Sequence, residues 1–383
     1  MNLKVEVAVS QLNKYGEELC GDCVEIAQDG YTVIVMSDGL GSGVKAHILA
    51  SLTTKMAATM LKGGLPLGEV IDSVASTLPV CEVRRLAYST FSILIIGPDY
   101  KAHLVEYDNP LAFLGRGSEL VTIDRQKKTY SGRVVQESFF QVNDGDWLVL
   151  VSDGVLHAGI GGIWNLGWGW NRIGDYLKRM ASREEDARSM AFGLIETTER
   201  LYAGKPGDDA TVVAVRIRAP RYLTVLAGPP VDMADDARVV AEFMASPGKK
   251  AICGGTTSLI VARETGHPVT VNMATMREGI PPTGQMEGVD LVCEGVLTLS
   301  RVADLFKDGA PLRRNLIYRS DGPSRLASLL LESDNIRFMV GRAINPAHQS
   351  PDLPIDLALK RRIIEDLCRR LNELGKNVRL DVY

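Results

Sequence analysis

The sequence predicts an α+β fold for residues 1–218, a sheet sandwich flanked by helices, followed by a smaller α/β domain over residues 222–383. Two observations lead to this prediction. In the first part strand patterns follow one another and the helices are grouped, whereas in the second part strands and helices alternate, as they do around a parallel sheet. A length of 383 residues also favours two hydrophobic cores over one.

The N-terminal domain begins with apolar segments separated by turn residues, which predict strands over Val5–Val9, Cys23–Ala27 and Thr32–Ser37. Apolar residues at helical spacing then predict helices over Val44–Leu61 and Leu67–Leu78. The remaining elements predicted for this domain are mostly strands. They are strands over Ser89–Gly97, Ala102–Tyr107, Leu111–Gly115, Glu119–Asp124, Arg133–Ser138 and Trp147–Ser152, helices near Asn171–Ala181 and Glu184–Leu201, and a last strand over Ala210–Arg218.

The C-terminal domain follows Pro220 and Arg221, so we place the domain boundary near residue 220. The segment from Ile280 to Leu299 is rich in proline, glycine and acidic residues, which predicts a loop near a sheet edge. An amphipathic helix over Leu357–Leu374 has basic residues on its outer faces, and we interpret these as a solvated surface. The alternating elements are a strand over Tyr222–Ala227, a helix over Asp235–Met244, a strand over Lys250–Cys253 and a helix over Thr257–Thr265.

The overall composition is that of a globular protein, with 45% hydrophobic and 23% charged residues. The net charge of −4 gives no reason to expect a nucleic-acid partner. The first residues lack the basic and apolar stretches of a signal peptide, and the longest apolar runs are far shorter than the ~20 residues of a spanning helix. We therefore expect a cytoplasmic protein that contacts neither nucleic acid nor a membrane.

The six cysteines are scattered along the chain, which argues against a disulfide framework in a protein of this size. Cys20 and Cys23 form a CxxC pair. A single pair cannot close a tetrahedral zinc site, so we favour a structural role, with redox chemistry and metal binding as alternatives.

Four aspartates lie at predicted strand ends, each beside glycine or another acid: Gly21-Asp22, Asp38-Gly39, Asp153-Gly154 and Asp208-Asp209. Three of these pairs adjoin strongly apolar strands, which would fix the direction of each carboxylate. Hard cations such as Mg²⁺ and Mn²⁺ prefer oxygen ligands of this kind, and glycine lets the backbone turn sharply beside them. A single Asp-Gly pair is most often a turn, so the spacing alone leaves both interpretations open.

Three segments carry a resemblance to a known family: MSDGLGSGVKA (36–46), VSDGV (151–155) and GDDATVVAVRI (207–217). They resemble the metal motifs of the type 2C (PPM) metal-dependent protein phosphatases, particularly the bacterial SpoIIE-like branch. The resemblance covers residues 1 to about 218. It implies a two-sheet antiparallel β-sandwich with helices outside each sheet. It also implies hydrolysis of phosphoserine or phosphothreonine by a hydroxide that bridges two Mn²⁺ or Mg²⁺ ions.

The resemblance also implies a role for each acidic residue. Asp38 would bridge both ions, and Gly39 would offer its backbone carbonyl to one of them. Asp153 and Asp208 would complete the shell of the other ion, and Asp22 would hold water ligands or a metal more loosely. The resemblance thus assigns catalysis to Asp38, Asp153 and Asp208.

The sequence departs from the family at one position. Relatives outside the bacterial branch often carry a histidine near the bridging aspartate, proposed to protonate the leaving oxygen, but Leu40 and Gly41 stand there in this chain. A metal-bound water is one replacement as the acid, and His157 is another. For His157 we favour a structural or surface role.

Three further segments could bind ligands. Lys45, one turn into a helix, would suit a phosphate, although a solvated lysine is the simpler interpretation. The glycine-rich segment 157–170 carries three tryptophans and is either a flap over the site or a packed loop. In the second domain an anion could bind at the start of a helix, where N-capping and a tight turn explain the sequence equally well. The residues of that possible ligand loop are Gly254, Gly255, Thr256 and Thr257.

These observations favour a serine/threonine protein phosphatase that acts on a regulatory phosphoprotein. The second domain would sense a small-molecule or protein effector, and a homodimer is possible. The alternative is a non-catalytic regulator that keeps the phosphatase fold in order to bind a partner. Only the resemblance argues against a phosphatase that acts on small metabolites.

Overall fold

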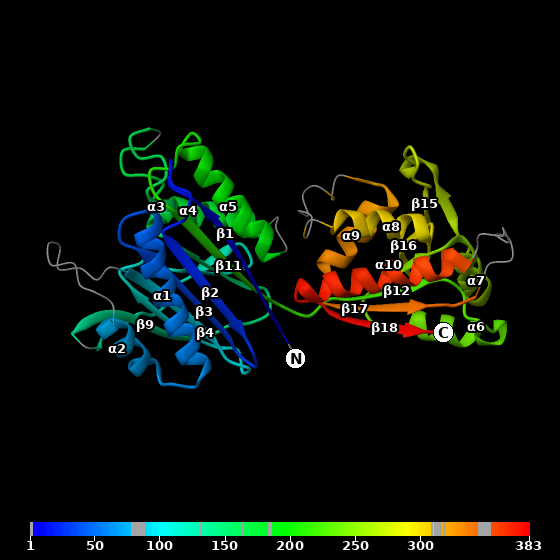
Figure 1. Ribbon diagram of the computed structural model, residues 1–383, viewed down its shortest axis with the longest axis horizontal. Helices are drawn as coiled ribbons and strands as arrows, with labels where there is room; N and C mark the ends of the chain where they lie inside the picture. The colour runs from blue at the N-terminus through cyan, green and yellow to red at the C-terminus, as the bar shows by residue number, and fades with distance from the viewer. Residues whose placement is uncertain are drawn as a thin grey trace. The chain divides into compact units, whose positions relative to one another are not determined.

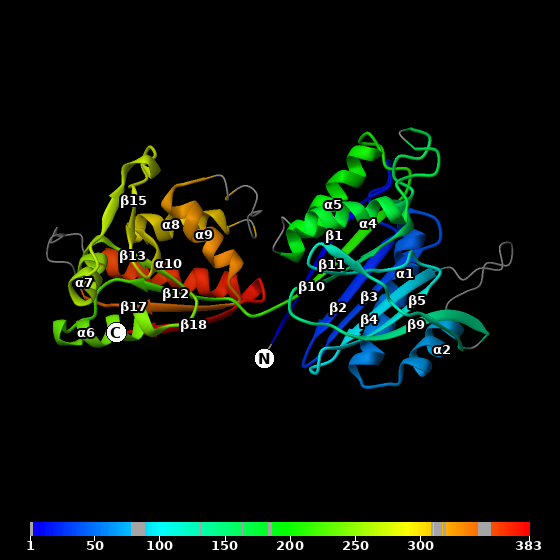
Figure 2. The same ribbon diagram turned by 180° about the vertical axis from the view of Figure 1, so that it is seen from behind.

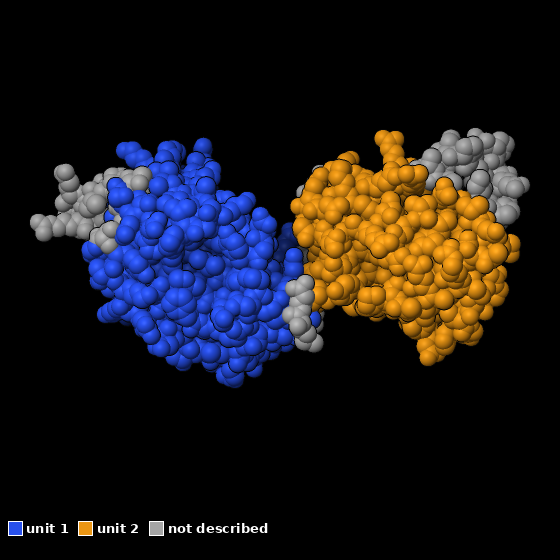
Figure 3. Space-filling view, turned by 90° about the horizontal axis from the view of Figure 1, so that it is seen from below, with its two compact units in different colours: residues 1–219 blue, residues 220–383 orange. Residues whose placement is uncertain are grey.

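The computed structural model (Figure 1) describes residues 3–77, 89–130, 132–162, 164–182, 186–307, 309, 316, 319–343 and 354–383. The chain forms two compact units, Met1–Ala219 and Pro220–Tyr383, which are coloured separately in Figure 3. None of the described helices is long and apolar enough to span a bilayer.

The first unit contains two sheets, and every strand pair within them is antiparallel. One sheet has the order β1-β11-β10-β6-β7, with strands Lys4–Leu12, Ala210–Arg218, Asp146–Val151, Phe113–Arg116 and Glu119–Val121. The other has the order β2-β3-β4-β5-β9-β8, with strands Asp22–Gln28, Thr32–Gly39, Ser89–Ile96, Lys101–Tyr107, Arg133–Gln141 and Gln126–Tyr130.

Helices cover the outer face of each sheet, as Figures 1 and 2 show. In β3, Val33 and Val35 pack against the helices, whereas Ile34 and Met36 pack between the two sheets. This alternation follows from the two-residue period of a strand and gives four layers, helix, sheet, sheet and helix. The predicted α+β sandwich is confirmed. Helices α1 (Gly43–Lys62) and α2 (Leu67–Thr77) cover the β3 sheet, and α4 (Trp170–Ala181) and α5 (Ala187–Leu201) cover the other.

Several boundaries differ from the predicted ones. Helix α5 begins at Ala187 because the side chain of Asp186 accepts a hydrogen bond from the Ser189 backbone and caps the helix. The predicted start at Glu184 lies outside the described residues, as does Leu78. The sequence patterns did not predict strand β8, whose residues are mostly exposed and polar, or the short helix α3 (Asp153–Leu156).

The second unit is built on a seven-stranded sheet of order β14-β15-β16-β13-β12-β17-β18. Neighbouring strands are parallel along the series β16, β13, β12, β17 and β18, and β14 and β15 form an antiparallel edge. The strands are β12 Tyr222–Ala227, β13 Lys249–Cys253, β14 Thr270–Asn272, β15 Thr283–Met286, β16 Val289–Cys293, β17 Asn335–Val340 and β18 Asn377–Val382. Helices α6 (Asp236–Ala245) and α7 (Gly255–Thr265) pack on one face, and α8 (Val296–Leu305), α9 (Gly322–Glu332) and α10 (Pro354–Glu373) on the other.

The predicted loop over Ile280–Leu299 is wrong for most of its length. Strands β15 and β16 and the start of α8 occupy this segment, and β16 ends in the buried residues Leu291, Val292 and Cys293. The prolines precede β15, and Gly288, with a positive φ, makes the turn between the two strands. The turn-forming residues therefore mark the ends of these strands rather than a long loop.

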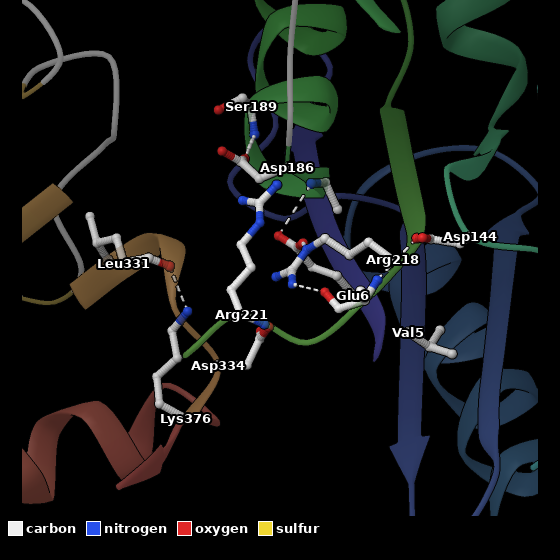
Figure 4. Close-up of polar contacts among 12 residues, drawn as sticks. Val5, Glu6, Asp144, Asp186, Ser189, Arg218, Arg221, Leu331, Asp334 and Lys376 are labelled. Atoms are coloured by element: carbon white, nitrogen blue, oxygen red, sulfur yellow. Dashed lines mark hydrogen bonds and ion pairs between the residues drawn. The ribbon is translucent and has the colours of Figure 1, made fainter. Parts of the chain in front are cut away.

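The chain passes between the units at Pro220 and is fixed on either side of it (Figure 4). The Ala219 backbone N–H donates to Asp144 Oδ1 over 3.0 Å within the first unit. The Arg221 backbone N–H donates to Asp334 Oδ2 over 2.8 Å within the second. The connection between the two units is therefore short and anchored at both ends.

Candidate metal centre

Strand pairing brings the predicted aspartates together in two groups. In the β2–β3 pair Asp22 stands directly opposite Asp38. In the other sheet Asp153 follows the end of β10, and Asp208 precedes the start of the neighbouring strand β11. Because the two strands are antiparallel, the end of one lies beside the start of the other.

The two groups also meet each other across the sandwich. Burial first, and then the charges of Asp22, Asp153 and Asp208, raise the pKa of Asp38 to about 9. A hydrogen-bond contact between the Asp38 and Asp153 carboxyl groups contributes to the same rise. The structure therefore brings these four predicted residues into one electrostatic cluster.

Two glycines of the Asp-Gly pairs are required by close packing. A Cβ at position 39 would lie 2.2 Å from the backbone oxygen of Ala46 in α1. A Cβ at position 154 would lie 2.0 Å from the backbone oxygen of Asp209. Neither backbone oxygen can move without shifting its element, so only glycine fits, and the close approach holds the aspartate pairs in place.

Asp22 is the most deeply buried of the predicted site residues, with 2% of its surface exposed. Burial is the main cause that raises its pKa to about 6, although the nearby Ser152 and Thr211 hydroxyls oppose the rise. Neither hydroxyl is placed for a proper hydrogen bond, because both carboxylate oxygens lack a partner. A buried carboxylate without donors is costly, and a cation would offset that cost.

Asp208 and Asp153 lie nearer the surface. Burial and then the charge of Asp153 raise the pKa of Asp208, and the Lys14 ammonium is among the groups that oppose this rise. The Asp153 side chain is 44% exposed, and its Oδ2 lies 4.0 Å from Nδ1 of His157, whose side chain is 51% exposed. His157 thus lies at the rim of the cluster, one helical turn after Asp153.

Asp209 is a site residue to which the sequence patterns assigned no role of its own. It is 3% exposed; its Oδ1 accepts a hydrogen bond from the Lys14 backbone N–H over 2.9 Å, and its Oδ2 is buried without a partner. A Cβ on Gly21 would lie 2.9 Å from that Oδ2. The doubled aspartate before a buried strand was the signal that could have revealed Asp209. Its hydrogen-bond partner Lys14, however, is 195 residues away in sequence.

The donor chemistry of the cluster fits a divalent cation. The charge of Asp153 acts on three of the other carboxyl groups, those of Asp22, Asp38 and Asp208, and the charge of Asp209 acts on those of Asp22 and Asp208. Across the part of the chain that the structure describes, no three acidic, histidine or cysteine side chains already form a metal-binding group. Mg²⁺ and Mn²⁺ prefer carboxylate oxygen donors of this kind.

The predicted phosphate lysine, Lys45, is exposed in the first turn of α1. A carboxylate lies at the start of this helix, because Glu17 Oε1 accepts a hydrogen bond from Ser42 Oγ over 3.0 Å. Glu17 therefore competes with a phosphate for this helix end. Phosphate binding by Lys45 remains a prediction.

The tryptophans of segment 157–170 pack against the domain. Trp168 is 3% exposed, and the Trp170 ring stacks on Phe113 with the ring centroids 4.6 Å apart. The Arg172 guanidinium lies 5.1 Å from the centroid of the Trp164 ring. These contacts support the interpretation of the segment as a packed loop rather than as a flap over the site.

The CxxC pair flanks Asp22. Burial raises the pKa of both thiols, well above the ordinary range for Cys20 and to about 11 for Cys23. The Cys23 Sγ lies 3.6 Å from His47 Nδ1, and neither cysteine forms a disulfide. A thiol that stays protonated is a poor nucleophile, which supports the structural interpretation.

In the second unit the predicted ligand loop joins β13 to α7. Gly254, with a φ of 137°, precedes the helix, and its N–H donates to the Cys293 carbonyl over 2.9 Å. The Thr257 Oγ1 accepts from the Gly228 N–H over 3.1 Å. Thr257 thus joins the end of β12 to the first turn of α7. Anion binding by Gly254, Gly255, Thr256 and Thr257 remains a prediction.

The two-sheet antiparallel sandwich with outer helices and with aspartates at its strand ends agrees with the fold that the type 2C (PPM) resemblance implies. The family model described as "Stage II sporulation protein E (SpoIIE)" matches residues 28–218. The N-terminal unit therefore contains a SpoIIE-like PPM phosphatase segment, and this family supports a phosphatase-type function.

Two curated relatives are both named "Stage II sporulation protein E". The one from Bacillus subtilis (strain 168) is 25% identical over 239 residues, which cover 58% of this chain and 27% of the relative. The one from Priestia megaterium is 25% identical over 224 residues, which cover 56% of this chain and 36% of the relative. The chain thus spans about a third or less of their length.

Among solved structures, the chain is similar to the PP2C phosphatase domain of Bacillus subtilis SpoIIE with a fragment of its regulatory domain. The identity is 24%, the TM-score is 0.48, and the match covers 56% of this chain and 62% of that one. It is also similar to the RsbU and RsbW domains of Rv1364c from Mycobacterium tuberculosis. There the identity is 18%, the TM-score is 0.47, and the coverage is 62% of this chain and 67% of that one.

Proposed function

We propose that the first unit hydrolyses phosphoserine or phosphothreonine on a regulatory phosphoprotein with the help of two Mn²⁺ or Mg²⁺ ions. One observation carries the proposal: Asp22, buried without a hydrogen-bond donor, stands opposite Asp38 in a cluster with Asp153 and Asp208. So many carboxylates in one place destabilise each other unless cations neutralise them. The SpoIIE family match gives independent support.

In this proposal each aspartate has a separate part. Asp38 would hold both ions with help from the Gly39 carbonyl. Asp153 and Asp208 would complete the shell of one ion from the neighbouring sheet, and Asp22 would hold water ligands or a metal more loosely. When bound, the ions supply charge neutralisation for the phosphoryl group and an activated water.

The test is metal-dependent release of phosphate from a phosphoserine peptide. Asp38→Asn and Asp153→Asn should each abolish release, as should a chelator added to the wild-type protein. Asp29→Asn is the matched control, because Asp29 is exposed in the turn at the far end of β2 from Asp22. Release that is unchanged by chelator or by Asp38→Asn would rule the proposal out.

The alternative is a regulator that binds a partner without catalysis. It would show metal binding and phosphopeptide binding with no release of phosphate under any metal. A phosphatase for small metabolites would prefer free phosphate esters over phosphopeptides in a substrate panel. For the second unit we propose that it senses a small-molecule or protein effector.

A further inference from the structure

Two loops of the first unit meet beside Asp208 and Asp209. One lies between β1 and β2, and the other follows α5. The Tyr15 N–H donates to the Pro206 carbonyl over 2.9 Å, and the Lys14 N–H donates to Asp209 Oδ1 over the same distance. These backbone contacts fix Lys14 and Tyr15 against the loop that leads into the candidate metal centre.

This rim is formed by Lys14, Tyr15 and Lys205, and the Lys14 backbone contacts the Asp209 carboxylate of the acidic cluster. The Tyr15 side chain is 64% exposed, and the Lys205 ammonium lies 5.5 Å from the centroid of its ring. Among the described residues no carboxylate forms an ion pair with either ammonium.

Cations at this rim have a physical explanation, because the acidic site must accept an anionic phosphate group. A rim that carries only carboxylates repels a phosphate dianion as it approaches. Two ammonium groups on anchored loops weaken that repulsion on one side of the site.

We propose that Lys14, Tyr15 and Lys205 form the docking rim for the substrate, a phosphorylated peptide segment with an acidic residue next to its phosphoserine or phosphothreonine. Lys14 meets the phosphate, Lys205 meets the neighbouring acid, and the Tyr15 ring packs against the peptide. This inference rests on the proposed phosphatase function and names the class of its substrate.

The experiment compares wild-type protein, Lys14→Met, Lys205→Met and the double variant. Each is given an acidic phosphoserine peptide, the same peptide with glutamine in place of the acid, and p-nitrophenyl phosphate. Binding is measured separately by fluorescence anisotropy with a non-hydrolysable phosphonate analogue of the acidic peptide. Lys62→Met is the control, since it removes the same charge from the exposed far end of α1, roughly 30 Å along a 20-residue helix.

We expect each single change to raise KM and Kd for the acidic peptide about 3- to 5-fold, as for the loss of one exposed charge pair. The double variant should raise KM and Kd for the acidic peptide about 10-fold or more, with kcat within about 2-fold of wild type. Added salt should weaken binding by wild type and have much less effect on the double variant. Lys205→Met should leave the KM for p-nitrophenyl phosphate and for the glutamine peptide unchanged.

The outcomes separate this inference from the function on which it rests. A double variant with wild-type Kd and salt dependence would overturn the rim while hydrolysis by the wild type upheld the function. An equal loss in Lys62→Met would also overturn it. Binding of the analogue without hydrolysis would support the rim and the non-catalytic alternative together. A wild-type protein that neither binds nor hydrolyses would overturn both.

Discussion

Asp22 and Asp38 stand directly opposite each other at the ends of two paired antiparallel strands. Like charges at such a position oppose the pairing, and here one of them is buried without a donor. Protonation of Asp38 lessens this repulsion in the metal-free protein, because burial and neighbouring charges raise its pKa to about 9. The first two predictions below follow from the raised pKa values of this pair.

Asp22→Asn should stabilise the metal-free protein, because it removes a buried charge and keeps the volume of the side chain. We expect the free energy of unfolding to increase on the order of 1–3 kcal/mol at pH 8, because the pKa of Asp22 is raised to about 6. The same variant should lose most of the stabilisation that Mn²⁺ gives the wild type. Chemical unfolding with chelator and with Mn²⁺ measures both effects. A loss of stability in chelator, compared with Asp29→Asn, would contradict the prediction.

The stability of the metal-free protein should fall as the pH rises from about 5 to 9. The folded-state pKa values of Asp38, about 9, and Asp22, about 6, lie above the ordinary values near 4. Folding therefore favours the protonated carboxyls, and this contribution is complete below about pH 4 and lost as the pH passes the folded-state values. Mn²⁺ should reverse the slope because it binds the ionised form. Unfolding curves in chelator that are flat over this range would count against the cluster.

His157→Gln should change kcat by less than about 3-fold, because the ring is exposed and stands at the rim, 4.0 Å from Asp153. A general acid would matter far more, by about 100-fold or more, and chiefly for poor leaving groups. The measurement compares kcat for a phosphoserine peptide with kcat for p-nitrophenyl phosphate, whose leaving group needs no acid. A selective loss on the peptide would assign the acid to His157.

Gly154→Ala should destabilise the first unit by roughly 1–3 kcal/mol and weaken metal binding, because the new Cβ would lie 2.0 Å from the Asp209 backbone oxygen. Gly162→Ala is the matched control, since its Cβ would make only an ordinary contact at 3.6 Å. Thermal unfolding and Mn²⁺ titration of both variants measure the effect. Equal stability of the two variants would show that the close approach at 154 is not needed.

Much of the first unit could be predicted from the sequence, because β3, β10 and β11 are buried on both faces and read as apolar runs. The aspartates at their ends were found for the same reason. What the sequence could not reveal depends on distant contacts: the bond from Lys14 to Asp209 joins residues 195 positions apart. β8 was missed because it has almost no buried residue.

The second unit shows the converse limit. Turn-forming residues were read as a loop across Thr283–Cys293, although this stretch supplies two strands of the sheet. Glycine and proline mark where a strand ends, and short buried strands between such marks carry too few residues for a clear alternating pattern.

Burial raises the pKa values of the Cys20 and Cys23 thiols, which flank Asp22 in the acidic cluster. Both thiols stay in the protonated form near neutral pH, so neither is a ready target for alkylation. The acidic centre beside them should therefore tolerate iodoacetamide under conditions that inactivate a thiolate enzyme. Chelation and alkylation together give a simple way to tell the two chemistries apart in a crude preparation.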